Sequence, residues 1–166
     1  MPLPSTLTPI ATNTLASATA SVTFSSIPQG YTDLVLVAVA RRGIDNSGGA
    51  GTVQFNSDSG SNYSTTYLYG TSGAALSFRW SNQTSMFAFA AGDSENAVNI
   101  LNIMNYANTT TYKTVISRIG WPNTNGRVVS SVNLWRSTSA ITSITLGAAN
   151  NITAGSTFTI YGVKAA

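Results

Sequence analysis

Turn-forming residues interrupt this chain of 166 residues about every 8 to 12 positions, and segments rich in Val, Ile, Thr and aromatic residues lie between them. Segments of this length and composition are typical of β-strands. Residues 34–39 are apolar at every position, which predicts a strand buried on both faces in the middle of a sheet. The Pro and Asn-Gly residues of 122–126 predict a hairpin turn.

The same pattern along the whole chain predicts about ten short strands and almost no helix. We expect strands at residues 22–24, 31–41, 52–55, 66–69, 75–80, 85–90, 98–104, 112–121, 128–136 and 157–163, and around Ile141, Ile144 and Leu146. Regularly spaced short strands are typical of antiparallel sandwiches and jelly rolls. The sequence therefore predicts a single all-β domain, an antiparallel β-sandwich or jelly roll, that is long enough to bury a core.

The N-terminal segment differs from the rest because it contains Pro2, Pro4 and Pro9. Proline excludes a helix interior and a central strand, so we expect residues 1–14 to form an extended, polyproline-like arm and residues 15–166 to form the β-sandwich. We expect the arm to contact another subunit or a larger shell. The expected contact residues are Pro2, Leu3, Pro4, Leu7, Pro9 and Ile10. A truncation that begins at Leu15 is expected to fold but to bind that partner poorly.

Charged residues make up only 8% of the chain, and His and Cys are absent. These absences exclude a Ser-His-Asp triad, a thiol nucleophile, a thiolate metal site and a disulfide framework. Asp93 and Glu95 form the only close pair of acids, which is the minimum that glycoside hydrolysis needs. A polar loop tip is the favoured interpretation of that pair, so the chain is predicted not to be an enzyme and to need no cofactor.

A second loop, residues 56–62, places oxygen-bearing side chains at alternate positions around Asp58. This spacing suits calcium, but the loop holds one carboxylate, and hard cations usually require more negative charge. Turn formation is therefore the favoured interpretation, and no metal site is predicted.

The eight Lys and Arg residues are scattered along the chain, which does not favour a nucleic-acid surface. Only Arg41 and Arg42 are adjacent, and a strand would direct them to opposite faces. The longest apolar run, residues 34–40, is far shorter than a membrane span, and the N-terminus lacks the pattern of a secretory signal. Neither nucleic acid nor membrane is expected as a partner.

Ser, Thr and Asn make up roughly a third of the chain, well above their average usage. Thr suits the half-solvated face of a sheet, but uncharged strands lack the usual protection of sheet edges. We therefore expect oligomerisation or docking to a larger shell, since interface cores are depleted of charge.

Aromatic residues leave a carbohydrate-stacking surface open as an alternative to core packing. The candidates are Trp80, Trp121 and Trp135 with Tyr63, Tyr67, Tyr69, Tyr106 and Tyr112. Four Asn residues, Asn62, Asn82, Asn108 and Asn151, begin glycosylation patterns, which chance explains in a chain so rich in Asn, Ser and Thr.

Residues 22–36, 53–64, 104–114, 134–146 and 158–164, taken in order, resemble a family of small virion structural proteins of tailed bacteriophages. The resemblance implies a β-sandwich of jelly-roll type on the outside of a particle, with no catalytic motif. It implies a capsid decoration, or cement, protein that binds the major capsid protein on the outer face of the head, commonly as a homotrimer, and stabilises the shell. The alternative is a tail fibre or receptor-binding protein that recognises a host surface glycan, and a polysaccharide depolymerase is a distant third.

Overall fold

The computed structural model describes residues 6–43, 50–93, 95–122 and 126–164, and within these ranges the regular elements are all strands. No helix long and apolar enough to cross a membrane occurs in these ranges. The strands are β1 (Leu7–Thr14), β2 (Thr19–Phe24), β3 (Asp33–Ala40), β4 (Ala50–Phe55), β5 (Tyr63–Gly70), β6 (Ala75–Gln83), β7 (Met86–Ala90), β8 (Ala97–Ile103), β9 (Lys113–Trp121), β10 (Arg127–Trp135), β11 (Ile144–Ile152) and β12 (Thr157–Val163).

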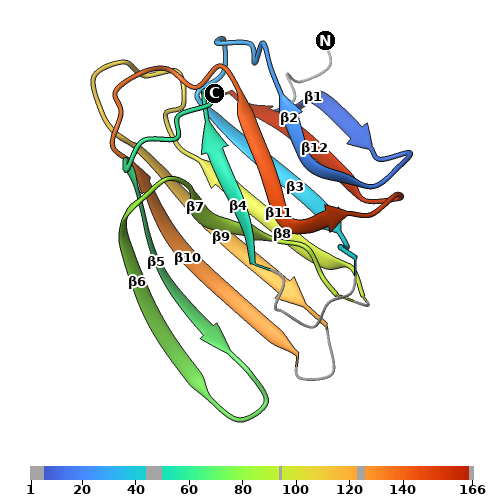
Figure 1. Ribbon diagram of the computed structural model, residues 1–166. Coiled ribbons are helices and arrows are strands. Elements are labelled where there is room, and N and C mark those ends of the chain that lie inside the picture. The colour runs from blue at the N-terminus through green and yellow to red at the C-terminus, as the bar shows by residue number, and fades with distance from the viewer. Residues whose placement is uncertain (1–5, 44–49, 94, 123–125, 165–166) are drawn as a thin grey trace.

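The strands form two sheets that pack face to face (Figure 1). The larger sheet has eight strands in the order β1-β12-β3-β8-β9-β10-β5-β6, and the smaller has four in the order β2-β11-β4-β7. All ten strand pairings are antiparallel. The predicted all-β fold with antiparallel sheets is therefore confirmed. β9 and β10 pair as the predicted hairpin requires, although residues 123–125 of its turn lie outside the described residues.

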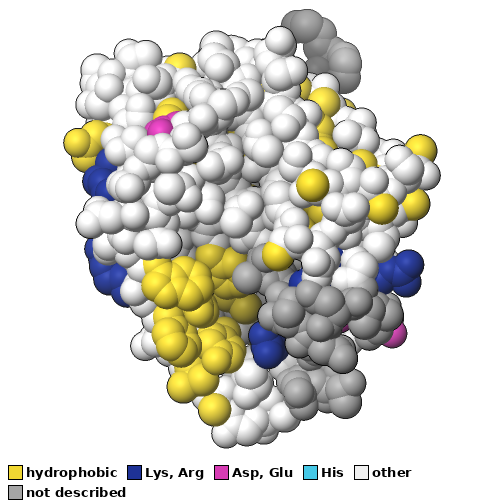
Figure 2. Space-filling view, viewed as in Figure 1, with side chains coloured by type: hydrophobic (Ala, Val, Ile, Leu, Met, Phe, Trp, Pro, Cys, Tyr) yellow, Lys and Arg dark blue, Asp and Glu magenta, His cyan; other side chains and the backbone are white. Residues whose placement is uncertain are grey.

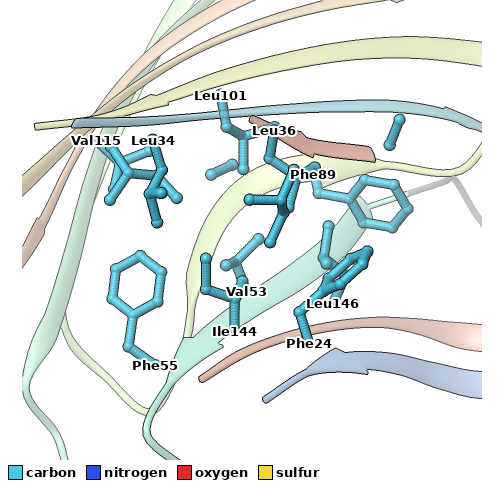
Figure 3. Close-up of a cluster of buried hydrophobic side chains, with 14 of the residues drawn as sticks. Phe24, Leu34, Leu36, Val53, Phe55, Phe89, Leu101, Val115, Ile144 and Leu146 are labelled. Atoms are coloured by element: carbon cyan, nitrogen blue, oxygen red, sulfur yellow. The ribbon is translucent and has the colours of Figure 1, made fainter. Parts of the chain in front are cut away.

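The main core lies between the two sheets (Figure 3). The central strand β3 alternates, with Leu34 and Leu36 fully buried in the core and Val35 and Val37 half-buried on the outer face of the larger sheet. Opposite them, the smaller sheet contributes Phe24, Val53, Phe55, Phe89, Ile144 and Leu146. β3 is therefore a central strand, as the apolar run predicted, but it is fully buried on its inner face only.

A row of buried polar side chains connects the larger sheet to β7. Thr65 Oγ1 donates to Asn133 Oδ1 at 2.7 Å, and the Phe87 N–H of β7 donates to Thr65 Oγ1 at 3.1 Å. Ser131 accepts from Asn133 and bonds Ser117 at 2.6 Å. Buried polar groups must be paired, so this row fixes how β7 sits on β5 and β10. Beyond it lies a second, smaller core of Ala90, Ala97, Ile119, Trp121 and Val129.

The N-terminal segment differs from the expected arm, because Leu7–Thr14 is an edge strand that pairs with β12. Its register runs from Leu7 opposite Val163 to Thr14 opposite Thr157, with an irregularity between Pro9 and Ala11. Proline lacks a backbone N–H, and an edge strand with a bulge is a position in a sheet that tolerates it. Pro excluded a central strand, as expected, but not an edge strand.

Candidate interaction surfaces

The two acids that the sequence singled out as a close pair have different environments. Asp93 accepts hydrogen bonds from Arg42, with Nε to Oδ1 at 2.7 Å and Nη2 to Oδ1 at 2.5 Å. The Arg42 side chain is 1% exposed and the Asp93 side chain 18%, so this ion pair beyond the end of β3 is largely buried. Glu95 is exposed. Asp93 is thus held by Arg42 within the protein, whereas Glu95 faces solvent.

Asp58, the carboxylate of the loop predicted to form a turn, accepts hydrogen bonds from within the protein. Its Oδ2 accepts from the indole Nε1 of Trp135 at 2.7 Å and from Asn62 at 3.0 Å, and its Oδ1 accepts from the Gly60 N–H at 2.8 Å. This arrangement closes the loop over the buried Trp135 ring and accords with turn formation. Among the described residues, no cluster of three or more acids could hold a metal ion.

Asp58 gives the protein an acid-sensitive contribution to stability. The hydrogen bond from Trp135, with smaller contributions from Asn62 and Gly60, lowers the pKa of the Asp58 carboxyl below its ordinary 3.8, although burial partly opposes them. A carboxyl whose pKa is lower in the folded chain than in the unfolded chain stabilises the fold at pH values above its unfolded-state pKa. This stabilisation is lost as the pH falls through the pKa of the folded chain.

We therefore expect the free energy of unfolding of Asp58→Asn to depend less on pH in the acid range than that of the wild type. The measurement is the free energy of unfolding in urea between about pH 6 and pH 2. The wild type should lose more stability than Asp58→Asn below about pH 4. Asp33→Asn is the control, because it replaces another carboxyl that accepts a backbone hydrogen bond. Parallel curves for the wild type and Asp58→Asn would contradict the assignment.

An aromatic cluster lies on the inner face of β5 and β6, where the larger sheet extends past β7. Its members are Tyr67, Tyr69, Phe78, Trp80 and Phe87. The Tyr67 ring contacts the other four, with centroid distances of 5.1 to 5.9 Å. Phe78 and Trp80 are each more than 40% exposed. A hydrophobic patch is visible in the lower part of Figure 2, where β5 and β6 run in Figure 1.

Three of the eight candidates for a carbohydrate-stacking surface meet in this cluster, namely Tyr67, Tyr69 and Trp80. Tyr63, Tyr106 and Trp135 are buried in the main core, Trp121 belongs to the smaller core, and Tyr112 is exposed in a separate place before β9. Phe78 and Phe87 were not among the predicted candidates. The alternation Leu76-Ser-Phe78-Arg-Trp80 could have indicated Phe78, which cross-strand pairing sets opposite Tyr67, but it gives no signal for Phe87 on β7.

A second apolar surface covers the outer face of the larger sheet, on the side away from the smaller sheet. We call it the outer apolar strip, and it consists of Leu68, Val98, Ile116, Val128 and Val132. These side chains lie on four neighbouring strands, because Val128 and Val132 of β10 flank Ser130, which is opposite Leu68, and Val132 is opposite Ile116. Their exposed fractions range from 42% to 72%. Contiguous exposed apolar surface marks an interaction site more often than scattered single residues do.

Gly120 creates a hollow at one end of the outer apolar strip. It lies in register between Val98 and Val128, and a Cβ atom added at this glycine would meet nothing within 4 Å. The hollow has a volume of about 360 Å³, and Trp121, Pro122, Gly126 and Arg127 also line it. A side chain from a partner could enter this space without displacing the sheet.

The strands that carry both surfaces hold no acidic residue. β5, β6, β9 and β10 contain four basic residues, Arg79, Lys113, Arg118 and Arg127, and no Asp or Glu. Arg118 is exposed within the outer apolar strip, between Ile116 and Gly120 on β9. Lys113 is buried and donates to the carbonyls of Thr111 and Thr138. A protein partner for this end of the molecule should therefore be apolar, and neutral or acidic.

Of the expected N-terminal contact residues, the structure describes Leu7, Pro9 and Ile10. Leu7 is 44% exposed and Pro9 is exposed, but Ile10 packs against the main core. Pro2, Leu3 and Pro4 lie outside the described residues. A truncation that begins at Leu15 would remove a paired strand and uncover β12, so loss of binding by that variant would not identify the contact residues.

No family model, curated protein or solved structure matches this chain. The two apolar surfaces and the charge of their strands are thus the features on which a functional assignment has to rest.

Proposed function

We propose that this chain is a bacteriophage virion structural protein, a capsid decoration protein that binds the major capsid protein through the outer apolar strip. The observation that carries the proposal is this strip, which presents five large aliphatic side chains on adjacent strands of one sheet face. Such a surface suits extensive contact between proteins. The resemblance of five sequence segments to phage virion proteins supports the choice of partner.

The strand pairing supports a jelly-roll architecture for this protein. If the β5-β6 and β9-β10 hairpins are treated as insertions, the remaining eight strands pair in nested order: β1 with β12, β2 with β11, β3 with β8 and β4 with β7. Successive pairs belong alternately to the larger and the smaller sheet, as they do when one long hairpin is rolled up. Jelly rolls are common in viral capsid and lectin domains. Both inserted hairpins extend the larger sheet and carry most of the outer apolar strip.

The charge of the inserted strands supports a protein partner whose binding surface carries acidic residues. Arg118 is exposed beside Ile116 and Val132, and no acidic residue occurs in β5, β6, β9 or β10. The binding patch on the capsid should therefore combine apolar side chains with carboxylates. Opposite charge at the rim of an interface raises the association rate and fixes orientation.

Gly120→Val is expected to weaken capsid binding without disturbing the fold. The new side chain fills the hollow of the outer apolar strip, and overpacking an interface by this much costs about 1–3 kcal/mol, roughly five- to 150-fold in affinity. The measurement is the occupancy of purified protein on particles that lack it. Gly30→Val is the matched control, because a Cβ atom at this exposed glycine also meets nothing within 4 Å.

Equal occupancy for Gly120→Val and Gly30→Val would contradict the use of this surface. The copy number per particle tests the proposal independently. On the order of hundreds of copies is expected for a protein that covers a symmetric shell. A few copies would place the protein in the tail instead.

The aromatic cluster favours one other function, recognition of a host glycan by a tail protein. Trp80 and Phe87 line a hollow of about 190 Å³ together with Thr52, Gln83 and Ser85. Aromatic rings beside neutral amide and hydroxyl groups can contact both the apolar face and the hydroxyl groups of a sugar. A tail protein with this function would be present in a few copies per particle. It would bind the glycan through the aromatic cluster rather than the outer apolar strip.

A further inference from the structure

Strand β6 exposes an unpaired backbone edge at one end of the larger sheet. All nine of its residues, Ala75 to Gln83, are exposed, and its strand partner is β5. Half of the N–H and C=O groups of an edge strand point away from the sheet, ready to pair with another chain. Natural edges are usually protected by several charges, by proline or by short length. β6 has no proline and one charged residue, Arg79.

Of the three other edge strands in the described part of the protein, β7 and β1 carry protection that β6 lacks, and β2 is only six residues long. On β7, the Phe87 N–H donates to Thr65 Oγ1, and the Ala90 N–H donates to Asn99 Oδ1. On β1, at the opposite end of the larger sheet, Pro9 removes a donor and the register shifts beside it. β6 has a register shift only at its end, between the pairs that involve Tyr63 and Thr65, so 75–80 remain regular.

We propose that a second copy of this chain pairs with β6, strand against identical strand, in antiparallel orientation about a two-fold axis. Such pairing joins two eight-stranded sheets into one continuous sheet and leaves no β6 edge free. A two-fold contact closes after two subunits. Pairing of β6 with β1 of another copy would instead be able to continue without limit, and Pro9 makes β1 a poor acceptor of a new strand.

The side chains of β6 select one register for this pairing. If Phe78 faces its own counterpart, Leu76 lies opposite Trp80 on the inner face, and all three of these positions are apolar and exposed. The same register sets Ser77 opposite Arg79 on the outer face. Moving the axis to Arg79 would oppose two arginines directly, which is destabilising. In the chosen register the aromatic cluster of one subunit continues into that of the other.

Charge substitutions at Ser77 test both the interface and its register. Light scattering of the purified chain should give a mass near twice 17.3 kDa. Ser77→Asp places a carboxylate opposite Arg79 and should tighten the dimer, whereas Ser77→Lys should loosen it. Each change acts twice across the axis, so the dissociation constant should shift roughly two- to thirtyfold in each direction. Combining Ser77→Lys with Arg79→Asp places opposite charges across the axis again, so it should reverse the loosening and bind about as tightly as Ser77→Asp.

Disulfide cross-linking provides a second measurement, because the chain contains no Cys. Phe78→Cys places two thiols directly opposite each other and should give a covalent dimer on oxidation. Ser77→Cys is the control, since its counterpart is offset along the strand by two residues and lies too far away. Leu76→Cys mixed with Trp80→Cys should cross-link, and neither should do so alone.

Three results would overturn the proposal. One is a monomer at all concentrations up to about 1 mM, far above the dissociation constants of specific interfaces. Another is an oligomer, including the trimer that the family resemblance implies, whose affinity does not respond to the Ser77 variants. The third is equal cross-linking of Phe78→Cys and Ser77→Cys. None of these measurements involves a phage particle, so the dimer and the capsid-binding function can fail separately.

Discussion

Asp93→Ala is expected to lower the free energy of unfolding by about 1.5–3 kcal/mol, because it removes a carboxylate to which the almost fully buried Arg42 side chain donates two hydrogen bonds. Both Nε and Nη2 of Arg42 donate to Asp93 Oδ1, and the Arg42 residue is 1% exposed. A hydrogen bond to a charged group stabilises the fold more than a hydrogen bond between neutral groups, and it is stronger where protein rather than water surrounds it. Urea unfolding followed by tryptophan fluorescence measures the change.

Two further variants separate this ion pair from other effects of the substitution. Glu95→Ala removes the exposed neighbouring acid and should change stability by less than about 0.5 kcal/mol. Arg42→Met removes the guanidinium from the same contact, so it should also lower the free energy of unfolding. If Asp93→Ala and Glu95→Ala were equally mild, the Arg42–Asp93 pair would not be a stabilising contact.

Asn99→Leu should be the second strongly destabilising substitution, with a loss of about 2–4 kcal/mol. Asn99 lies on β8 and is fully buried. Its amide binds the backbone of Ala90 on β7 twice, because Oδ1 accepts from the Ala90 N–H at 2.8 Å and Nδ2 donates to the Ala90 carbonyl at 2.9 Å. Leucine has a similar volume but leaves both backbone groups of Ala90 without these partners, and each orphaned group costs about 1–3 kcal/mol.

The control for Asn99 is Asn102→Leu on the same strand. Asn102 is half-buried on the outer face, where water can replace lost hydrogen bonds. Its substitution should change stability by less than about 0.5 kcal/mol. Hydrogen exchange of the Ala90 amide gives a local readout, since this proton should lose protection in Asn99→Leu and not in Asn102→Leu. Unchanged protection in Asn99→Leu would show that the amide bridge does not hold β7.

The strands were predictable because their signal is local. The alternation of residues 157–163 gives β12 with its observed bounds, and the apolar run at 34–39 identifies β3 as a central strand. Alternation also separates Arg41, which is exposed, from Arg42, which is buried. The sequence alone could not assign Leu7–Thr14 to a sheet, because its partner β12 lies at the other end of the chain and proline tolerance depends on the edge position.

The candidate surfaces were only partly predictable because they depend on register. Tyr67, Tyr69 and Trp80 were identified as aromatic candidates, but their separation from the buried Tyr63 and Trp135 required the pairing of β5 with β6 and the limited width of the smaller sheet. The outer apolar strip was missed. Its residues are spread over four strands. Within a single strand, the alternation of side chains does not tell an apolar residue on the exposed face from one in the core.

The nested pairing of the strands has a consequence for how this protein is made. The first strand, β1, finds its partner β12 only when the last part of the chain has been synthesised, and β2 waits in the same way for β11. Contacts between such distant segments make folding slow, on the order of milliseconds to seconds. Throughout translation the nascent chain therefore exposes unpaired hydrophobic strands, which are prone to aggregate. Its low charge gives those strands little electrostatic repulsion, so dependable production of the protein should rely on chaperones or slow synthesis more than its small size suggests.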